Sequence, residues 1–156
     1  MNFLEQLIAE WYAYQDYLVL TNINFGKRLK GGYEGEIDII AFDPKKKTLV
    51  HLETSSDADS WKERQEKFQK KFETASKHYS SIFNIKFEKV RKIAVVNLSK
   101  PKKTIDFGNN IALVSIPEMM TEITEGMRKF DPRKAAVPEK YPLLRAIQFA
   151  IWFGSN

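Results

Sequence analysis

The stretch GEIDIIAFDPKKKTLVHLETS, residues 35–55, decides the fold of this 156-residue chain. It holds two strand-like runs, residues 36–42 and 48–55, joined by the turn sequence DPKKK. Two consecutive strands joined by so short a turn are expected to pair antiparallel. Because residues two apart on a strand point to the same face, Asp38 and Glu53 are expected to converge near the strand ends.

Two converging carboxylates repel each other unless a cation lies between them. Mg²⁺ and Mn²⁺ prefer oxygen ligands, and Mg²⁺ keeps several of its waters. A cation held in this way lowers the pKa of a bound water and stabilises charge on a phosphoryl group. The pair therefore predicts a metal-dependent phosphodiesterase site. The alternative is simpler: charged residues alternating with apolar ones mark the solvated face of a half-exposed sheet.

Apolar spacing and turn residues predict the other elements. They are a helix at 2–15, a strand at 17–25, a helix from about 60 to 80 capped by Asp59 or Ser60, strands at 90–99 and 111–116, and helices at 117–129 and 142–153. The order α-β-β-β-α-β-β-α-α predicts a single α/β domain over residues 1–156, with a mixed central sheet flanked by helices. The apolar last helix either closes the core or forms the face of a homodimer.

GYEGEIDIIAF followed by TLVHLETS resembles the core of the PD-(D/E)XK, or restriction-endonuclease-like, nuclease superfamily. It is similar in particular to archaeal Holliday-junction resolvases and bacterial GEID-type endonuclease-like proteins. The resemblance covers about residues 3–98, whose order α-β-β-β-α-β matches the superfamily core, and leaves a C-terminal extension. It implies that Asp38 and Glu53 are metal ligands of a DNA endonuclease. It also implies a role for Glu5, placed like the resolvases' first-helix glutamate, with Glu10 as a competing choice.

The chain departs from the superfamily at Ser55, where the motif Glu-x-Lys has its lysine. That lysine is thought to orient or deprotonate the attacking water and to stabilise the charged transition state. A serine hydroxyl has neither the charge nor the reach. Either a lysine enters from elsewhere, Lys62 of the next helix or Lys27 or Lys30 of the preceding loop, or the protein binds nucleic acid or a protein partner without cutting.

The net charge of +5 and the isoelectric point near 9.3 are compatible with a polyanionic partner, here DNA. Basic residues flank the carboxylate strands on both sides, and an aromatic residue in the glycine-rich loop is suited to stack on a base. The residues expected to contact nucleic acid are Lys27, Arg28, Lys30, Tyr33, Lys67 and Lys70. The alternative is that these lysines only solvate one helix face and one loop.

Composition excludes several other classes of site. The chain has no cysteine and two histidines, so disulfides, thiolate metal sites and histidine-rich zinc sites are not expected. His51 lies on the Glu53 face of its strand and either assists proton transfer or is structural. No signal peptide and no apolar run of about 20 residues is present, which predicts a cytoplasmic protein without a membrane partner.

Overall fold

A five-stranded mixed sheet runs through the centre of the structure, a computed structural model that describes residues 2–55, 60–82, 84–98 and 107–154. Its strands are β1 (Leu18–Phe25), β2 (Gly35–Asp43), β3 (Thr48–Ser55), β4 (Lys89–Val96) and β5 (Ile111–Ser115), in that spatial order. β1, β2 and β3 pair antiparallel, whereas β3, β4 and β5 pair parallel. The prediction of an α/β fold with a mixed sheet is confirmed.

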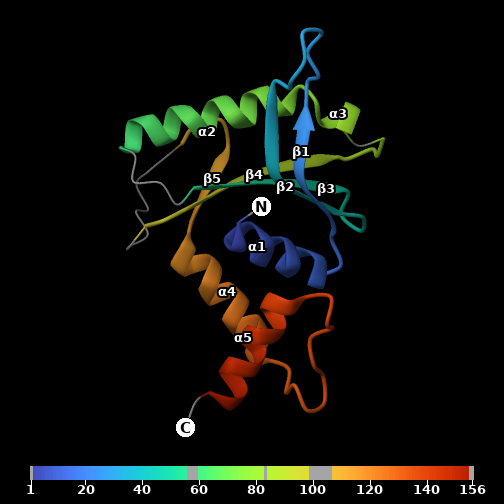
Figure 1. Cartoon of the computed structure of the whole chain (residues 1–156), viewed down its shortest axis with the longest axis vertical. Coiled ribbons are helices and arrows are strands. Elements are labelled where there is room, and N and C mark those ends of the chain that lie inside the picture. The colour runs from blue at the N-terminus through green and yellow to red at the C-terminus, as the bar shows by residue number, and fades with distance from the viewer. Residues whose placement is uncertain (1, 56–59, 83, 99–106, 155–156) are drawn as a thin grey trace.

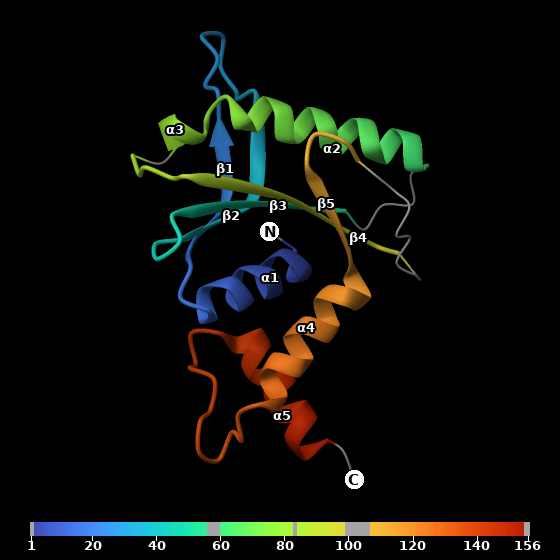
Figure 2. The same cartoon turned by 180° about the vertical axis from the view of Figure 1, so that it is seen from behind.

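Helices cover both faces of this sheet. α1 (Phe3–Tyr14), α4 (Ile116–Arg128) and α5 (Pro142–Phe153) lie on one side, and α2 (Trp61–Ser76) and α3 (Tyr79–Ile82) lie on the other (Figures 1 and 2). Because parallel strands need a crossover, α2 and α3 connect β3 to β4. The core order α-β-β-β-α-β is present, with additional C-terminal helices.

The helix expected from about residue 60 to 80 begins as predicted, with Ser60 as its N-cap, but is interrupted near its end. The amides of Lys77 and His78 bond to carbonyls three residues back, Thr74 and Ala75, which tightens the last turn. The chain then starts the four-residue helix α3, whose Tyr79 side chain is buried. This break directs Tyr79 into the core.

Apolar side chains of β2 and β3 pack on both sides of the sheet. One set joins the core beneath α1, and the other joins the core beneath the end of α2 and α3. These sets are Ile39, Ala41, Val50 and Leu52 on the α1 side, and Ile40, Phe42 and Leu49 on the opposite side. The half-exposed sheet face considered for this region is therefore wrong, since Asp38 is 9% exposed and Glu53 is fully buried.

The C-terminal helix α5 closes the core on the α1 side. Leu144 and Gln148 are fully buried, and the Gln148 amide bonds to the backbone of Val137, Phe130 and Ala135. Of the two roles considered for this helix, core closure is confirmed, and a homodimer stays a prediction. No helix within the described ranges is both long and apolar enough to cross a membrane.

Candidate active site

The site lies where β2 and β3 separate. Their ladder ends at the pair formed by Ile39 and Leu52, and the next residues outward are Asp38 and Glu53. Here carboxylates take the place of backbone acceptors: the amide of Thr54 donates to Asp38 Oδ2 at 2.9 Å, and the amide of Asp38 lies 3.4 Å from Glu53 Oε1. The two carboxylates expected to converge are therefore together.

A lysine from α2 reaches both carboxylates. The Lys71 ammonium contacts Glu53 Oε2 and lies 3.4 Å from Asp38 Oδ1. Its side chain is 46% exposed, whereas Glu53 is fully buried, so the amine reaches the carboxylates from the solvent side. Each carboxylate comes from a different strand and the cation from a helix, which together make one polar cluster at the end of the sheet.

The electrostatics of this cluster are asymmetric. Burial and the neighbouring charge of Glu53 raise the pKa of Asp38 to about 6, although Lys71 opposes the rise. Burial also acts to raise the pKa of Glu53, but the hydrogen bond from His51 and the charge of Lys71 outweigh it and hold that pKa below its usual range. With both carboxyls ionised, one lysine balances two negative charges, and the remaining charge favours a further cation.

A buried histidine and tyrosine hold Glu53 from the opposite side. His51 Nε2 lies 2.7 Å from Glu53 Oε1, and Tyr79 Oη lies 2.6 Å from His51 Nδ1. Burial lowers the pKa of His51 despite the nearby carboxylate, so the ring is neutral. Because a carboxylate only accepts, Nε2 carries the proton, and Nδ1 accepts from the Tyr79 hydroxyl. Of the two roles considered for His51, these contacts support the structural one: it positions Glu53.

The two glutamates of α1 have different locations. Glu5 Oε1 accepts from the Thr54 hydroxyl at 3.3 Å, and that hydroxyl lies 3.5 Å from Asp38 Oδ2, so Glu5 borders the site. Glu5 also completes the capping box of α1. Glu10 does not reach the site. Its Oε2 accepts the amides of Leu143 and Leu144, which are unpaired donors in the first turn of α5.

The lysine in the site is not one of those expected from the sequence. Lys62 lies nine residues before Lys71 on α2, about 14 Å along the helix axis. Lys27 and Lys30 are exposed in the loop between β1 and β2. Ser55 is half-buried at the end of β3.

A signal for Lys71 was present in the helical spacing. The buried side of α2 includes Phe68, Phe72 and Ala75. Lys71 is three residues after Phe68 and four before Ala75, so it interrupts the apolar stripe of its own helix. A cation at such a position points toward the sheet. The lysines that solvate α2 lie at other positions around the helix.

A groove of about 280 Å³ adjoins Lys71 between α2 and the start of β2. Lys67 and Lys70, both expected to contact nucleic acid, line it together with Lys71. Its opposite wall includes Glu34 and Glu36. The other residues expected to bind nucleic acid, Lys27, Arg28, Lys30 and Tyr33, are exposed in the loop between β1 and β2. That loop projects past α2 (Figure 1).

The donor set suits a hydrated hard cation rather than an all-protein metal cage. In the part of the chain that the structure describes, no three His, Asp or Glu side chains are grouped as metal ligands. Mg²⁺ is nevertheless commonly bound through one or two carboxylates, with waters completing its shell. Asp38 and Glu53 supply two such carboxylates, and burial together with the charge of Glu53 raises the pKa of Asp38.

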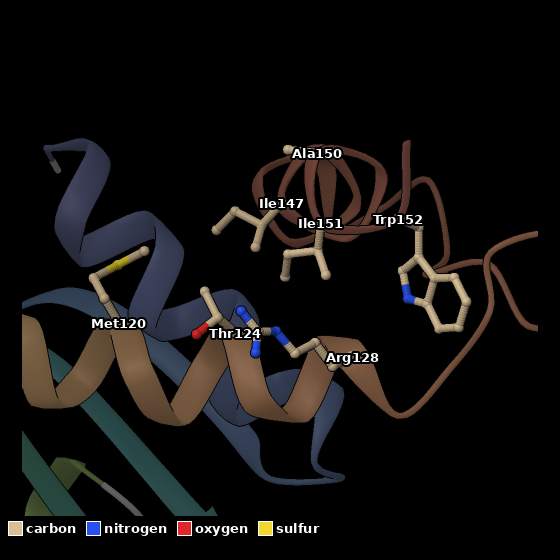
Figure 3. A pocket seen from close by; sticks show the side chains of 7 residues that line it. All are labelled: Met120, Thr124, Arg128, Ile147, Ala150, Ile151 and Trp152. Carbon is tan, nitrogen blue, oxygen red and sulfur yellow. The ribbon is translucent and has the colours of Figure 1, made fainter. Parts of the chain in front are cut away.

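A second hollow, of about 650 Å³, lies between α4 and α5. Figure 3 shows its lining side chains: Met120, Thr124, Arg128, Ile147, Ala150, Ile151 and Trp152. The lining is mostly apolar and contains no carboxylate. It therefore lacks the groups for metal or acid–base chemistry, and the cluster around Glu53 is the better candidate site.

Comparison with known proteins supports the fold alone. No protein-family model matches the chain, and no curated protein matches its sequence. A crystal structure of AF1548, described as a protein of unknown function, matches with a TM-score of 0.58 at 14% sequence identity. The match covers 98% of this chain and 98% of that one. The whole arrangement, C-terminal helices included, thus has a counterpart among solved structures.

Proposed function

We propose that this protein is a metal-dependent DNA endonuclease of the PD-(D/E)XK superfamily in which Lys71 replaces the motif lysine. One observation carries the proposal: the Lys71 ammonium meets the carboxylates of both Asp38 and Glu53. The departure at Ser55 argued against catalysis because it removed the cation. A lysine supplied by α2 answers that objection.

In this mechanism Asp38 and Glu53 hold Mg²⁺ or Mn²⁺, which when bound acidifies a water and stabilises charge on the phosphoryl group. Lys71 is held as a cation. Burial acts to lower its pKa, but the charges of Glu53 and Asp38 outweigh that effect and raise the pKa above its usual range. Lys71 therefore orients the water and stabilises the anionic phosphate; it does not abstract a proton.

Neighbouring residues hold the two carboxylates in position. His51 and Tyr79 fix the orientation of Glu53, while the Thr54 amide fixes Asp38. Lys67 and Lys70 in the adjoining groove are suited to hold the DNA backbone. Buried hydrogen bonds of this kind keep the carboxylates in place before substrate arrives, as a preorganised site requires.

A second candidate function is DNA binding without cleavage. The observation that favours it is the limited donor set, since no group of three metal-ligating side chains occurs among the described residues. A nuclease fold that lost its metal would retain the basic groove and loop. In either case we propose DNA as the partner and the cytoplasm as the location.

A nuclease assay on a panel of DNA structures with Mg²⁺ or Mn²⁺ separates the two functions. We expect cleavage that requires the metal and is lost in Asp38→Ala. Glu139→Gln, an exposed carboxylate in the loop before α5, is the matched control and should cut like the wild type. Binding that falls steeply with added salt, without cleavage under any metal, would favour the second function. Failure to bind DNA at low salt would refute both.

A further inference from the structure

The tip of the β1–β2 loop presents an apolar side chain to solvent. Leu29 is fully exposed. It lies in a turn closed by a bond from the Gly31 amide to the Arg28 carbonyl at 3.1 Å. Lys27, Arg28 and Lys30 surround it, and all three are exposed. Leu29 therefore packs in none of the hydrophobic cores of the described residues, and basic side chains surround it.

The root of this loop is firmly held. The Glu34 amide bonds to the carbonyls of Phe25 and Gly26, both at 3.0 Å, and the Glu34 carboxylate lies 3.1 Å from His78 Nε2. Phe25 is buried and its ring packs on His78 with centroids 5.0 Å apart. Gly35 lies against the same ring, where a Cβ would come within 2.6 Å of it. The loop is thus an arm fixed at its base to His78, between α2 and α3.

The arm and the site belong to one surface. The groove beside Lys71 is lined by Phe25 and Glu34 from the arm's root and by Lys67 and Lys70 from α2. The arm continues from this root past α2 (Figures 1 and 2). A nucleic-acid backbone lying beside Lys67 and Lys70 in the groove would therefore pass the root of the arm.

We propose that Leu29 is a wedge that enters the base stack of DNA next to the bound phosphates. The proposal rests on the proposed function and adds a substrate class: duplexes whose stack is already interrupted by a mismatch, a nick or a gap. Apolar wedges flanked by cations partly unstack a base step, and the cost is least where stacking is already lost. The fixed root keeps the arm ordered before binding, so little entropy is lost in placing it.

The test uses the full chain without divalent cation and a short duplex carrying a fluorescent adenine analogue at a mismatch, with the fully paired duplex as reference. We expect fluorescence to rise on binding, and a Kd about tenfold lower for the mismatched duplex. Leu29→Ser should abolish the rise and most of that preference. Leu18→Ser, which replaces an exposed leucine on β1, should retain both.

The results distinguish failure of the wedge proposal from failure of the proposed nuclease function. Binding without a fluorescence rise, or a rise that Leu29→Ser leaves intact, overturns the wedge while DNA binding and cleavage stand. Loss of metal-dependent cleavage with the rise intact overturns the nuclease but supports the wedge. Binding to anionic lipid vesicles that Leu29→Ser abolishes, with no DNA binding, would assign the tip to a membrane surface and overturn the proposal.

Discussion

The ammonium group of Lys71 on α2 contacts the fully buried carboxylate of Glu53 on β3. These residues are 18 positions apart in the chain. The contact joins the helix after β3 to the end of that strand, close to Ser55. The position of α2 over the sheet therefore determines whether the site has its cation.

Replacing Lys71 by methionine should remove catalysis while leaving DNA binding largely intact. The side chain keeps most of its length but loses the charge that stabilises the scissile phosphate, so we expect kcat to fall about 10²–10³-fold. Single-turnover cleavage and fluorescence anisotropy measure the two effects. Lys77→Met, at the C-cap of the same helix, is the control. An unchanged cleavage rate in Lys71→Met would remove this lysine from the mechanism.

A double variant tests the replacement directly. Ser55→Lys places a lysine at the motif position, and in the Lys71→Met background we expect it to restore part of the lost rate. Ser55→Met in the same background adds length without charge and should restore nothing. Equal rates in the two double variants would mean that the cation cannot be supplied from β3.

Asp38→Asn should stabilise the metal-free protein at high pH. The folded-state pKa of Asp38 is about 6, above its usual 3.8, so ionisation disfavours folding. That penalty is absent below about pH 4, grows between pH 4 and 6, and is complete above pH 6. We therefore expect urea unfolding to show a gain of about 2 kcal/mol at pH 8 that disappears near pH 4.

Added metal should make the wild type more stable than Asp38→Asn at pH 8. Mg²⁺ or Mn²⁺ bound to the native state raises the stability of the wild type by mass action, whereas Asp38→Asn should gain little. Glu139→Gln should follow the wild type at both pH values. A variant less stable than the wild type in metal-free buffer at pH 8 would show that Asp38 is a net stabilising group.

Tyr79→Phe should loosen Glu53 without touching it. The change deletes the hydroxyl that donates to His51 Nδ1, which leaves a buried acceptor unpaired and costs about 1–2 kcal/mol of unfolding free energy. Without that donor His51 still donates from Nε2 to Glu53 but loses the bond that fixes the other side of its ring, so kcat should fall with little change in KM. Nitrogen NMR of His51 reports the loss of the hydrogen bond at Nδ1, and Tyr14→Phe on α1 is the control. An unchanged Nδ1 signal with lower kcat would contradict this account.

Gly126→Ala should destabilise the fold although alanine is the better helix former. At an exposed position inside a helix, replacing glycine by alanine raises the free energy of unfolding by about 1 kcal/mol. Here a Cβ would overlap the buried Trp11 ring, which cannot move aside because its indole donates to Glu122 at 2.9 Å. We expect a net loss of about 1–3 kcal/mol in urea unfolding. Glu125→Ala, on the exposed side of α4, should lose less than 1 kcal/mol.

Strand alternation made the carboxylate pair predictable. Side-chain direction on a strand has a period of two, and the short turn DPKKK leaves little freedom in register. Asp38 and Glu53 therefore had to meet once both strands were recognised. The strand predicted at residues 90–99 is β4, whose near-continuous apolar centre fits a strand buried on both faces.

The contacts of Lys71 and Glu10 depend on how the helices pack on the sheet and on each other. Helical spacing marks Lys71 as facing the sheet, but the strand ends that it reaches are set by the packing of Phe68 and Phe72 against β4 and β5. The location of Glu10 could not be predicted either, because its partners Leu143 and Leu144 lie more than 130 residues further along the chain. Such contacts are not readable from spacing within one element.

The delivery of the cation by a helix has a consequence for evolution. Under the proposed function Lys71 supplies the charge, so position 55 is released from selection for lysine and is free to drift to residues such as serine. Relatives of this chain should then show covariation between the two positions, with a lysine at 55 or at 71. Active descendants that lack both should be rare.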